Sequence, residues 1–161
     1  MNEINATSER LMRETIALAR ENVRTHGGGP FAALIVSGDE IIARGVNRVT
    51  VDNDPTAHAE IAAIRSACRM RMSFDLSGLE LYASCEPCPM CLGAIYWAKL
   101  DRVVFAADRR DAAAVGFEDA LIYDELQRSF DRRRLPFTRL LREEAIQVLA
   151  EWREDPAREP Y

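Results

Sequence analysis

"HAE" at residues 58–60 and "SCEPCPMC" at residues 84–91 are the two stretches that best indicate how this chain folds. The first stretch offers a histidine and a carboxylate, and the second offers cysteines at every third position. Zinc takes tetrahedral nitrogen and sulfur ligands, and a catalytic zinc keeps three protein ligands with one position open. His58, Cys88 and Cys91 could supply those three, since residues three apart share one face of a helix.

Cys85 is the remaining cysteine of the stretch, and spacing alone does not separate it from the other two. A Cys85–Cys88 pair, or all three cysteines, would satisfy the same pattern. Because Cys85 lies at the end of a predicted strand and Pro87 divides it from the helix that follows, we favour Cys88 and Cys91. The alternative is a closed structural zinc site built from all three cysteines and His58.

A proline stands just ahead of each group of candidate ligands, where a helix is expected to begin. Residues 55–71 predict a helix with Pro55 at its first position and Asp54 as its cap. Residues 87–100 predict a second helix, opened by Pro87. Two helix N-termini would then converge on the metal, and their dipoles favour thiolates there.

Glu60 would have no role in a closed zinc site, whereas an open site gives it one. From the first turn of its helix, the carboxylate can lean over the open side of the metal. It could take a proton from the attacking water and hand it to a substrate nitrogen, first as base and then as acid. The combined pattern H-x-E…P-C-x-x-C is typical of zinc deaminases that act on cytosine or adenine. The sequence therefore favours a zinc-dependent enzyme.

Alternating helix and strand patterns surround these motifs. Helical spacing of apolar residues predicts a helix over 8–25, which "GGGP" at 27–30 ends without forming a phosphate-binding loop. Short apolar runs predict strands, the first two joined as a hairpin, over 31–36, 41–47, 79–84 and 102–107. With the two site helices, this order is that of an α/β sandwich.

The residues after 107 are expected to complete the same domain. Residues 108–119 predict a long loop, of a length that is often functional. "ALIYDELQRSF" and "LREEAIQVLAEWRED" predict helices, with room for a short strand at "FTRLL". No repeat, linker or second domain is evident, so we expect a single domain over residues 1–161.

Composition narrows the classes of function. The 161 residues suit one domain, and a formal net charge of −5 argues against a nucleic-acid substrate. The basic cluster "DRRRLP" at 131–136 is interpreted as a solvated loop. No apolar run approaches the ~20 residues of a membrane span, and the N-terminus lacks a signal-peptide pattern, so we expect a cytoplasmic protein. Clustered cysteines in such a protein favour metal binding or catalysis over disulfides, whereas the isolated Cys68 is expected to be a core residue.

Four stretches together resemble a known family. "NDPTAHAE" (53–60), "SCEPCPMCLGAIYWA" (84–98), "DAAAVGFEDALIY" (111–123) and the terminal tyrosine are similar to bacterial guanine deaminases, within the cytidine-deaminase-like superfamily. The resemblance implies a three-layer α/β/α fold around a mixed five-stranded sheet. It implies that one zinc per chain supports hydrolysis of the 2-amino group of guanine, giving xanthine and ammonia. It also implies a homodimer in which C-terminal segments, residues 131–161, are exchanged.

The resemblance also implies roles for individual residues. His58, Cys88 and Cys91 match the zinc ligands, and Glu60 matches the proton shuttle. The matches around the substrate are Asp119 as a second carboxylate near the leaving amino group, Asn47 and the backbone of Ala59 as hydrogen-bonding partners of the purine, Phe31 and Trp97 as pocket aromatics, and Tyr161 as a residue that closes the partner chain's pocket. Simpler interpretations exist for several of them: a turn former for Asn47, core residues for Phe31 and Trp97, and a helix N-cap for Asp119.

Two other kinds of function remain open. The substrate could be another aminated ring, such as guanosine, ammeline or another triazine, cytosine, or adenosine in tRNA, although the acidic charge balance argues against tRNA. A non-catalytic binding module stabilised by zinc is the alternative from a different class. Release of ammonia from a panel of bases discriminates among all of these.

Overall fold

A mixed sheet of four strands carries the segments that lead into the metal-site motifs. The computed structural model describes residues 5–160, and within them the strand order is β2-β1-β3-β4. The strands are β1 (Ala32–Ser37), β2 (Glu40–Val46), β3 (Glu80–Cys85) and β4 (Arg102–Ala107). β1 runs antiparallel to both of its neighbours, while β3 and β4 are parallel. The hairpin and the mixed sheet predicted from the sequence are confirmed.

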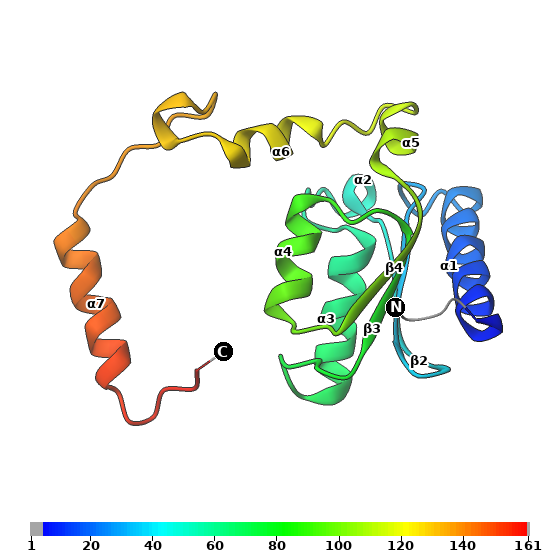
Figure 1. Cartoon of the computed structure of the whole chain (residues 1–161), viewed down its shortest axis with the longest axis horizontal. Coiled ribbons are helices and arrows are strands. Elements are labelled where there is room, and N and C mark those ends of the chain that lie inside the picture. The colour runs from blue at the N-terminus through cyan, green and yellow to red at the C-terminus, as the bar shows by residue number, and fades with distance from the viewer. Residues whose placement is uncertain (1–4, 161) are drawn as a thin grey trace. The chain divides into compact units, whose positions relative to one another are not determined.

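Helices cover both faces of this sheet, as Figure 1 shows. α1 (Ala6–Arg24) packs against β1 and β3 on one face. On the other face, α3 (Ala59–Arg71) packs against β1 and β2 and contacts α4 (Pro89–Trp97). The expected three-layer α/β/α architecture is therefore confirmed.

The side chains of β1 divide the core between the two layers, because successive residues of a strand point to opposite faces. Leu34 and Val36 join Leu11 of α1 in one buried cluster. Ala33 and Ile35 belong to the other buried cluster, which includes residues of α3 and α4. A strand buried on both faces reads as a continuous apolar run, which is why this one was visible in the sequence.

Gly45 permits a close contact between β2 and α3. A Cβ at this position would overlap the carbonyl oxygen of Ala59 and lie 2.5 Å from the backbone nitrogen of Ala63. Any side chain there would push α3 away from the sheet. Gly45 therefore sets the depth at which the first turn of α3, with His58 and Glu60, lies against the end of β2.

Both site helices begin later than the sequence predicts. α3 begins at Ala59 with His58 as its N-cap, and α4 begins at Pro89 with Cys88 as its N-cap. Pro89 rather than Pro87 thus occupies the first helical position.

Asp54 does not cap α3, because its carboxylate is used within its own turn. Its Oδ1 accepts hydrogen bonds from the backbone nitrogen of Thr56 at 2.8 Å and from its hydroxyl at 2.7 Å. The turn follows the short helix α2 (Val49–Asp52), which ends at Asn53 in the left-handed region. The predicted cap is therefore wrong.

No strand follows β4 within residues 108–160, so the expectation of a fifth strand is wrong. The segment "FTRLL", where the sequence allows a short strand, has no regular secondary structure. Pro136 directly precedes this segment and cannot donate to a strand ladder, and consecutive arginines stand just before that proline.

The helices after β4 fall on both sides of a boundary between two compact units, one ending at Asp119 and the other beginning at Ala120. The first unit includes α5 (Arg109–Ala113), within the predicted loop, and the second comprises α6 (Ala120–Gln127), the 3-10 helix η1 (Phe130–Arg132) and α7 (Arg142–Glu154). In the second unit, the guanidinium of Arg133 lies 4.7 Å from the ring of Phe130 and 4.8 Å from that of Phe137. Part of the basic cluster at 131–136 is therefore packed rather than simply solvated. None of the helices in residues 5–160 is long and apolar enough to cross a membrane.

Candidate metal and catalytic site

Three side chains from two helix N-termini meet near the C-terminal ends of β2 and β3. His58 is the N-cap of α3, Cys88 is the N-cap of α4, and Cys91 lies in the first turn of α4. Nδ1 of His58 lies 3.5 Å from the sulfur of Cys88 and 3.5 Å from that of Cys91, and the two sulfurs are 3.6 Å apart. This is the group of potential metal ligands that residues 5–160 bring together.

The spacing of these atoms fits a zinc ion. Zn–S bonds of about 2.3 Å and a Zn–N bond of about 2.0 Å at tetrahedral angles place sulfur and nitrogen about 3.5 Å apart and two sulfurs about 3.8 Å apart. The observed separations of 3.5 and 3.6 Å match these edges closely. With three ligand atoms, one tetrahedral position stays open, as in a catalytic site. The predicted zinc cofactor is confirmed by this fit.

The caps of both helices serve the metal rather than the helix. Neither His58 nor Cys88 makes the side-chain hydrogen bond to the first turn that an N-cap residue ordinarily makes. The partial positive charge at each helix N-terminus favours thiolate ligands there.

The two thiols titrate differently. The pKa of Cys88 falls to about 4, because its sulfur shares a hydrogen bond with Cys91 and lies beside the ring of His58. The pKa of Cys91 is raised by the same hydrogen bond to Cys88 and by burial. A divalent cation between the two sulfurs would hold both as thiolates.

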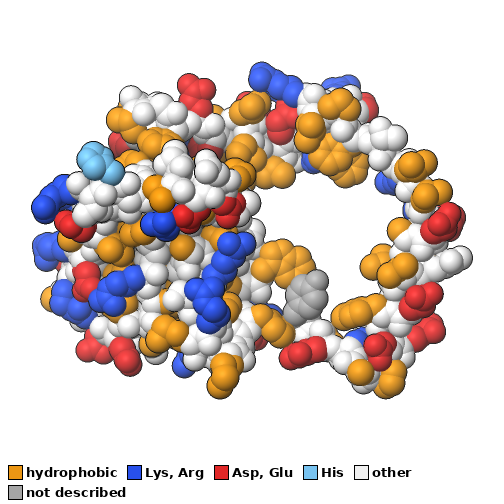
Figure 2. Space-filling view, turned by 180° about the vertical axis from the view of Figure 1, so that it is seen from behind, with side chains coloured by type: hydrophobic (Ala, Val, Ile, Leu, Met, Phe, Trp, Pro, Cys, Tyr) orange, Lys and Arg blue, Asp and Glu red, His pale blue; other side chains and the backbone are white. Residues whose placement is uncertain are grey.

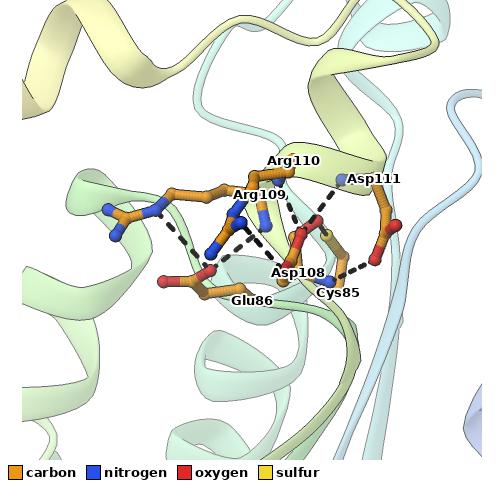
Figure 3. Close-up of polar contacts among 6 residues, drawn as sticks. All are labelled: Cys85, Glu86, Asp108, Arg109, Arg110 and Asp111. Atoms are coloured by element: carbon orange, nitrogen blue, oxygen red, sulfur yellow. Dashed lines mark hydrogen bonds and ion pairs between the residues drawn. The ribbon is translucent and has the colours of Figure 1, made fainter.

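Cys85 is not part of the cluster. It ends β3, and its thiol points to the carbonyl oxygen of Asp108 at 3.6 Å (Figure 3). Burial raises its pKa to about 11, so it stays a protonated thiol. The choice of Cys88 and Cys91, made on the position of Pro87, agrees with this geometry.

The contacts around Cys85 hold the start of the predicted loop against the end of β3 (Figure 3). The carboxylate of Glu86 accepts a hydrogen bond from the backbone nitrogen of Arg109 at 3.1 Å. The carboxylate of Asp108 accepts from the backbone nitrogens of Arg110 at 2.7 Å and Asp111 at 3.1 Å, forming a capping box at α5. The segment that leads to Asp119 is thereby anchored at its beginning.

Glu60 lies in the first turn of α3, directly beside the metal ligands. The residue is only 7% exposed. Burial raises the pKa of its carboxyl, and the neighbouring Cys88 thiolate raises it further. Such a carboxyl holds a proton more readily than an exposed glutamate does, which suits a group that accepts and returns protons.

Asp119 ends the first unit and immediately precedes α6. Its pKa is raised by partial burial and by the charge of Cys88. The role of Asp119 near the leaving amino group stays a prediction. Its position before α6 is also where an N-cap would be, and that role stays a prediction.

Asn47 and Phe31 flank the hairpin of β1 and β2. Asn47 follows β2 and is 6% exposed, and its Oδ1 accepts hydrogen bonds from the backbone nitrogens of Gly29 and Val49. Phe31 precedes β1, and its ring meets that of Phe117 edge-on at 4.8 Å between centroids. Phe117 was missed in the sequence, although it stands in the quoted "GFED", because nothing local indicates that it would return to Phe31.

Ala59 lies between His58 and Glu60 at the first position of α3 and is buried. Its backbone thus belongs to the helix start that faces the cluster. Trp97 ends α4 and is 67% exposed. Since Cys88 caps the other end of that helix, about 13 Å of helix rise separates them, and the structure does not bring Trp97 to the cluster. Tyr161 lies outside the described residues.

Known proteins share both the sequence and the fold. Residues 5–107 match the family described as the cytidine and deoxycytidylate deaminase zinc-binding region. The chain is 45% identical to the guanine deaminase of Bacillus subtilis over 153 residues, covering 95% of this chain and 98% of that protein. The X-ray structure of a guanine deaminase from Bacillus subtilis is similar with a TM-score of 0.92 and 44% identity, covering 98% of this chain and 99% of its own.

Two further relatives are less similar. The structure of a guanine deaminase from Nitrosomonas europaea has a TM-score of 0.68 and 34% identity, covering 92% of this chain and 86% of its own. A tRNA-specific adenosine deaminase of Aquifex aeolicus is 35% identical, covering 78% of this chain and 81% of that protein.

Proposed function

The chain belongs to the cytidine and deoxycytidylate deaminase zinc-binding family, and from this premise we propose that it converts guanine and water into xanthine and ammonia. The observation that supports guanine as the substrate is the similarity to a guanine deaminase at 45% identity over 95% of the chain. That match includes most of the residues after Asp119, whereas the match to the tRNA-specific adenosine deaminase covers 78% of this chain. A small nucleobase is therefore the substrate class.

The roles of the ligands follow from the cluster. His58, Cys88 and Cys91 would hold zinc, which when bound supplies the Lewis acidity that makes water a nucleophile near neutral pH. Glu60 takes a proton from the water as its oxygen bonds to C2 of guanine and returns it to a ring nitrogen. Glu60 then moves the second proton of that water to the amino group. The bond between C2 and the amino nitrogen breaks, ammonia leaves, and the oxygen stays on C2 of the product xanthine. The raised pKa of Glu60 suits a group that must hold a proton between these steps.

The remaining residues of this unit would bind and orient the flat ring. We assign Asn47 and the backbone of Ala59 to hydrogen bonds with the purine, and Phe31 to contact with its face. Asp119 is assigned to the leaving amino group, supported by the influence of the Cys88 charge on its pKa. A carboxyl at that place can accept an N–H hydrogen bond and stabilise the amine as it takes up a proton.

The complete site is proposed to need a second chain. The first unit exposes Trp97, and the outer edge of β4 pairs with no other described strand. The second unit independently exposes an apolar row on α7, made of Ile146, Leu149 and Trp152. Such surfaces are typical of interfaces, so residues 1–161 are proposed to act as a single deaminase domain in a homodimer that exchanges residues 131–161. Tyr161 would then close the partner's pocket.

The compartment is proposed to be the cytoplasm. All four cysteines are free, and a zinc site with two thiolates is retained best where thiols stay reduced.

The test of the proposed activity is turnover of a panel of rings. Purified protein of measured zinc content is incubated with guanine, guanosine, adenine, cytosine, ammeline and a tRNA substrate. We expect ammonia and xanthine in equal amounts from guanine, loss of activity after chelation, and recovery with added zinc. Faster turnover of another ring would overturn the assignment of guanine as the substrate. Absence of ammonia from every ring tested would favour a binding module.

The test of the exchanged segment uses two impaired variants. A protein lacking Tyr161 and a Glu60→Gln protein are unfolded together and refolded as mixed dimers. If the tail crosses between chains, one site combines an intact Glu60 with an intact partner tyrosine, and activity returns. Confirmed mixed dimers without recovery would mean that the tail does not close the partner's pocket.

A further inference from the structure

Asn22 of α1 is buried outside the metal cluster, and its amide is committed to two residues at the edge of the site. Its Nδ2 donates hydrogen bonds to the carbonyl oxygens of Gly29 at 2.8 Å and Asn47 at 2.9 Å. The residue is 6% exposed. Burying an amide is costly unless its hydrogen bonds are made, so a residue that only filled this space would be apolar.

Gly29 bonds the side chain of Asn47 as well as that of Asn22. Its backbone nitrogen donates to Oδ1 of Asn47 at 3.2 Å, and the backbone nitrogen of Val49 donates to the same oxygen at 3.3 Å. Asn22, Gly29 and Asn47 therefore form a closed ring of hydrogen bonds. Because two N–H groups face Oδ1, the carboxamide of Asn47 has one orientation, with its NH2 group turned to the opposite side.

The "GGGP" loop is shaped around this ring. A Cβ at Gly28 would overlap the carbonyl oxygen of Asn47, and a Cβ at Gly27 would overlap Oδ1 of Asn22. A Cβ at Gly29 would lie 3.0 Å from Oδ1 of Asn47. Gly28 also has a φ of 138°, a conformation that side chains rarely adopt. These glycines, which in the sequence only end a helix, allow the loop to approach Asn47.

The ring adjoins the first turn of α3. The backbone nitrogen of Arg48, the residue after Asn47, donates to the carbonyl oxygen of Ala57 at 2.9 Å, next to His58. The backbone nitrogen of Asn47 donates to the carbonyl oxygen of Phe31 at 3.0 Å. The N–H groups of Gly29 and Val49 thus set the orientation of the Asn47 carboxamide, and Asn22 of α1 holds Gly29 in place for this contact.

We propose that Asn22 is a positioning residue for substrate recognition. It holds the glycine loop so that Asn47 presents its NH2 group, and not its oxygen, to an acceptor atom of the purine. The inference rests on the proposed function, since it takes Asn47 to contact the base.

A double-mutant cycle on the whole protein tests this. Asn22→Asp keeps the shape but replaces the donating NH2 group with an oxygen, and Asn47→Ala removes the carboxamide. We expect Asn22→Asp to lower kcat/KM for guanine about tenfold, the equivalent of one hydrogen bond to the substrate. In the Asn47→Ala background the same change should alter kcat/KM less than about twofold, while the melting temperature falls in both backgrounds.

A purely structural role predicts a different pattern. Asn22→Asp would then lower kcat/KM by the same factor with and without the Asn47 carboxamide, and that result would overturn the inference. Thr15→Val is the matched control, since Thr15 is a fully buried polar residue of the same helix whose hydroxyl donates to the carbonyl oxygen of Leu11 within that helix. It should lower the melting temperature and leave kcat/KM at the parent value.

Gly29→Ala approaches the same carboxamide from the other side, should Asn22→Asp fail to fold. Its Cβ would press on Oδ1 of Asn47, so it should also cost about tenfold in kcat/KM and lose that effect in Asn47→Ala. Equal losses in both backgrounds would again overturn the inference. The parent protein is assayed first, and the cycle is run on the ring that it deaminates. Failure of the proposed substrate thus appears in the parent, and failure of the inference appears in the cycle.

Discussion

Replacing Glu60 with glutamine removes the proposed proton shuttle without changing its shape. The carboxyl is buried, and burial disfavours its charged form, so an uncharged amide of the same shape should cost the fold little. We therefore expect zinc content and melting temperature near the parent values. Loss of one acid–base group costs ~10²–10⁴ in rate, and Glu60 serves at least two successive proton transfers. Turnover should accordingly fall by more than about 10⁴-fold.

The assay is ammonia and xanthine release at saturating guanine, with zinc measured on the same samples. Glu80→Gln is the matched control, because Glu80 pairs with Arg102 at 3.6 Å at the beginning of β3, whereas Cys88 and Cys91 follow the end of that strand. It should retain parent turnover. Zinc-loaded Glu60→Gln within tenfold of the parent would refute the assignment of proton transfer to this residue.

Three further outcomes are expected. Cys88→Ala should lose zinc while Cys85→Ala keeps it, and metal analysis showing loss from a folded Cys85→Ala protein would contradict the ligand set. Asp119→Asn should cut turnover without lowering the melting temperature; unchanged turnover would leave only a capping role, which asparagine fills equally well. The pKa of Asp75 is held at about 2, first by hydrogen bonds from Ser77 and then by Lys99. A depressed pKa contributes stability above the unfolded value of about 4 that is lost as pH falls toward 2, so Asp75→Asn should lower the melting temperature near neutral pH, and a difference that does not shrink below about pH 4 would contradict this.

The fold class could be predicted because its signals are local. β1 is a continuous apolar run between turn residues, and α1 repeats apolar residues at helical spacing. Its two core layers then follow from the alternation of Leu34 and Val36 with Ala33 and Ile35. The later start of α3 was not predicted, because Asp54 is an equally good cap and turn residue, and only its bonds to Thr56 decide between them.

By itself, the sequence determined the kind of chemistry. The histidine, the carboxylate and the paired cysteines are a zinc-site pattern whatever surrounds them, since ligand type and helical spacing decide what ion can bind. The resemblance to guanine deaminases then indicated guanine as the substrate of this chemistry.

Only the tertiary structure decided which groups share the site. Cys85 and Cys88 have the same spacing as Cys88 and Cys91, but β3 directs the first sulfur to Asp108 while α4 directs the other pair to His58. Phe117 and Asn22 likewise have no local signal, because their partners lie far along the chain. The physical reason is that a side chain's chemistry belongs to the residue, whereas its direction is set by the packing of elements distant in sequence.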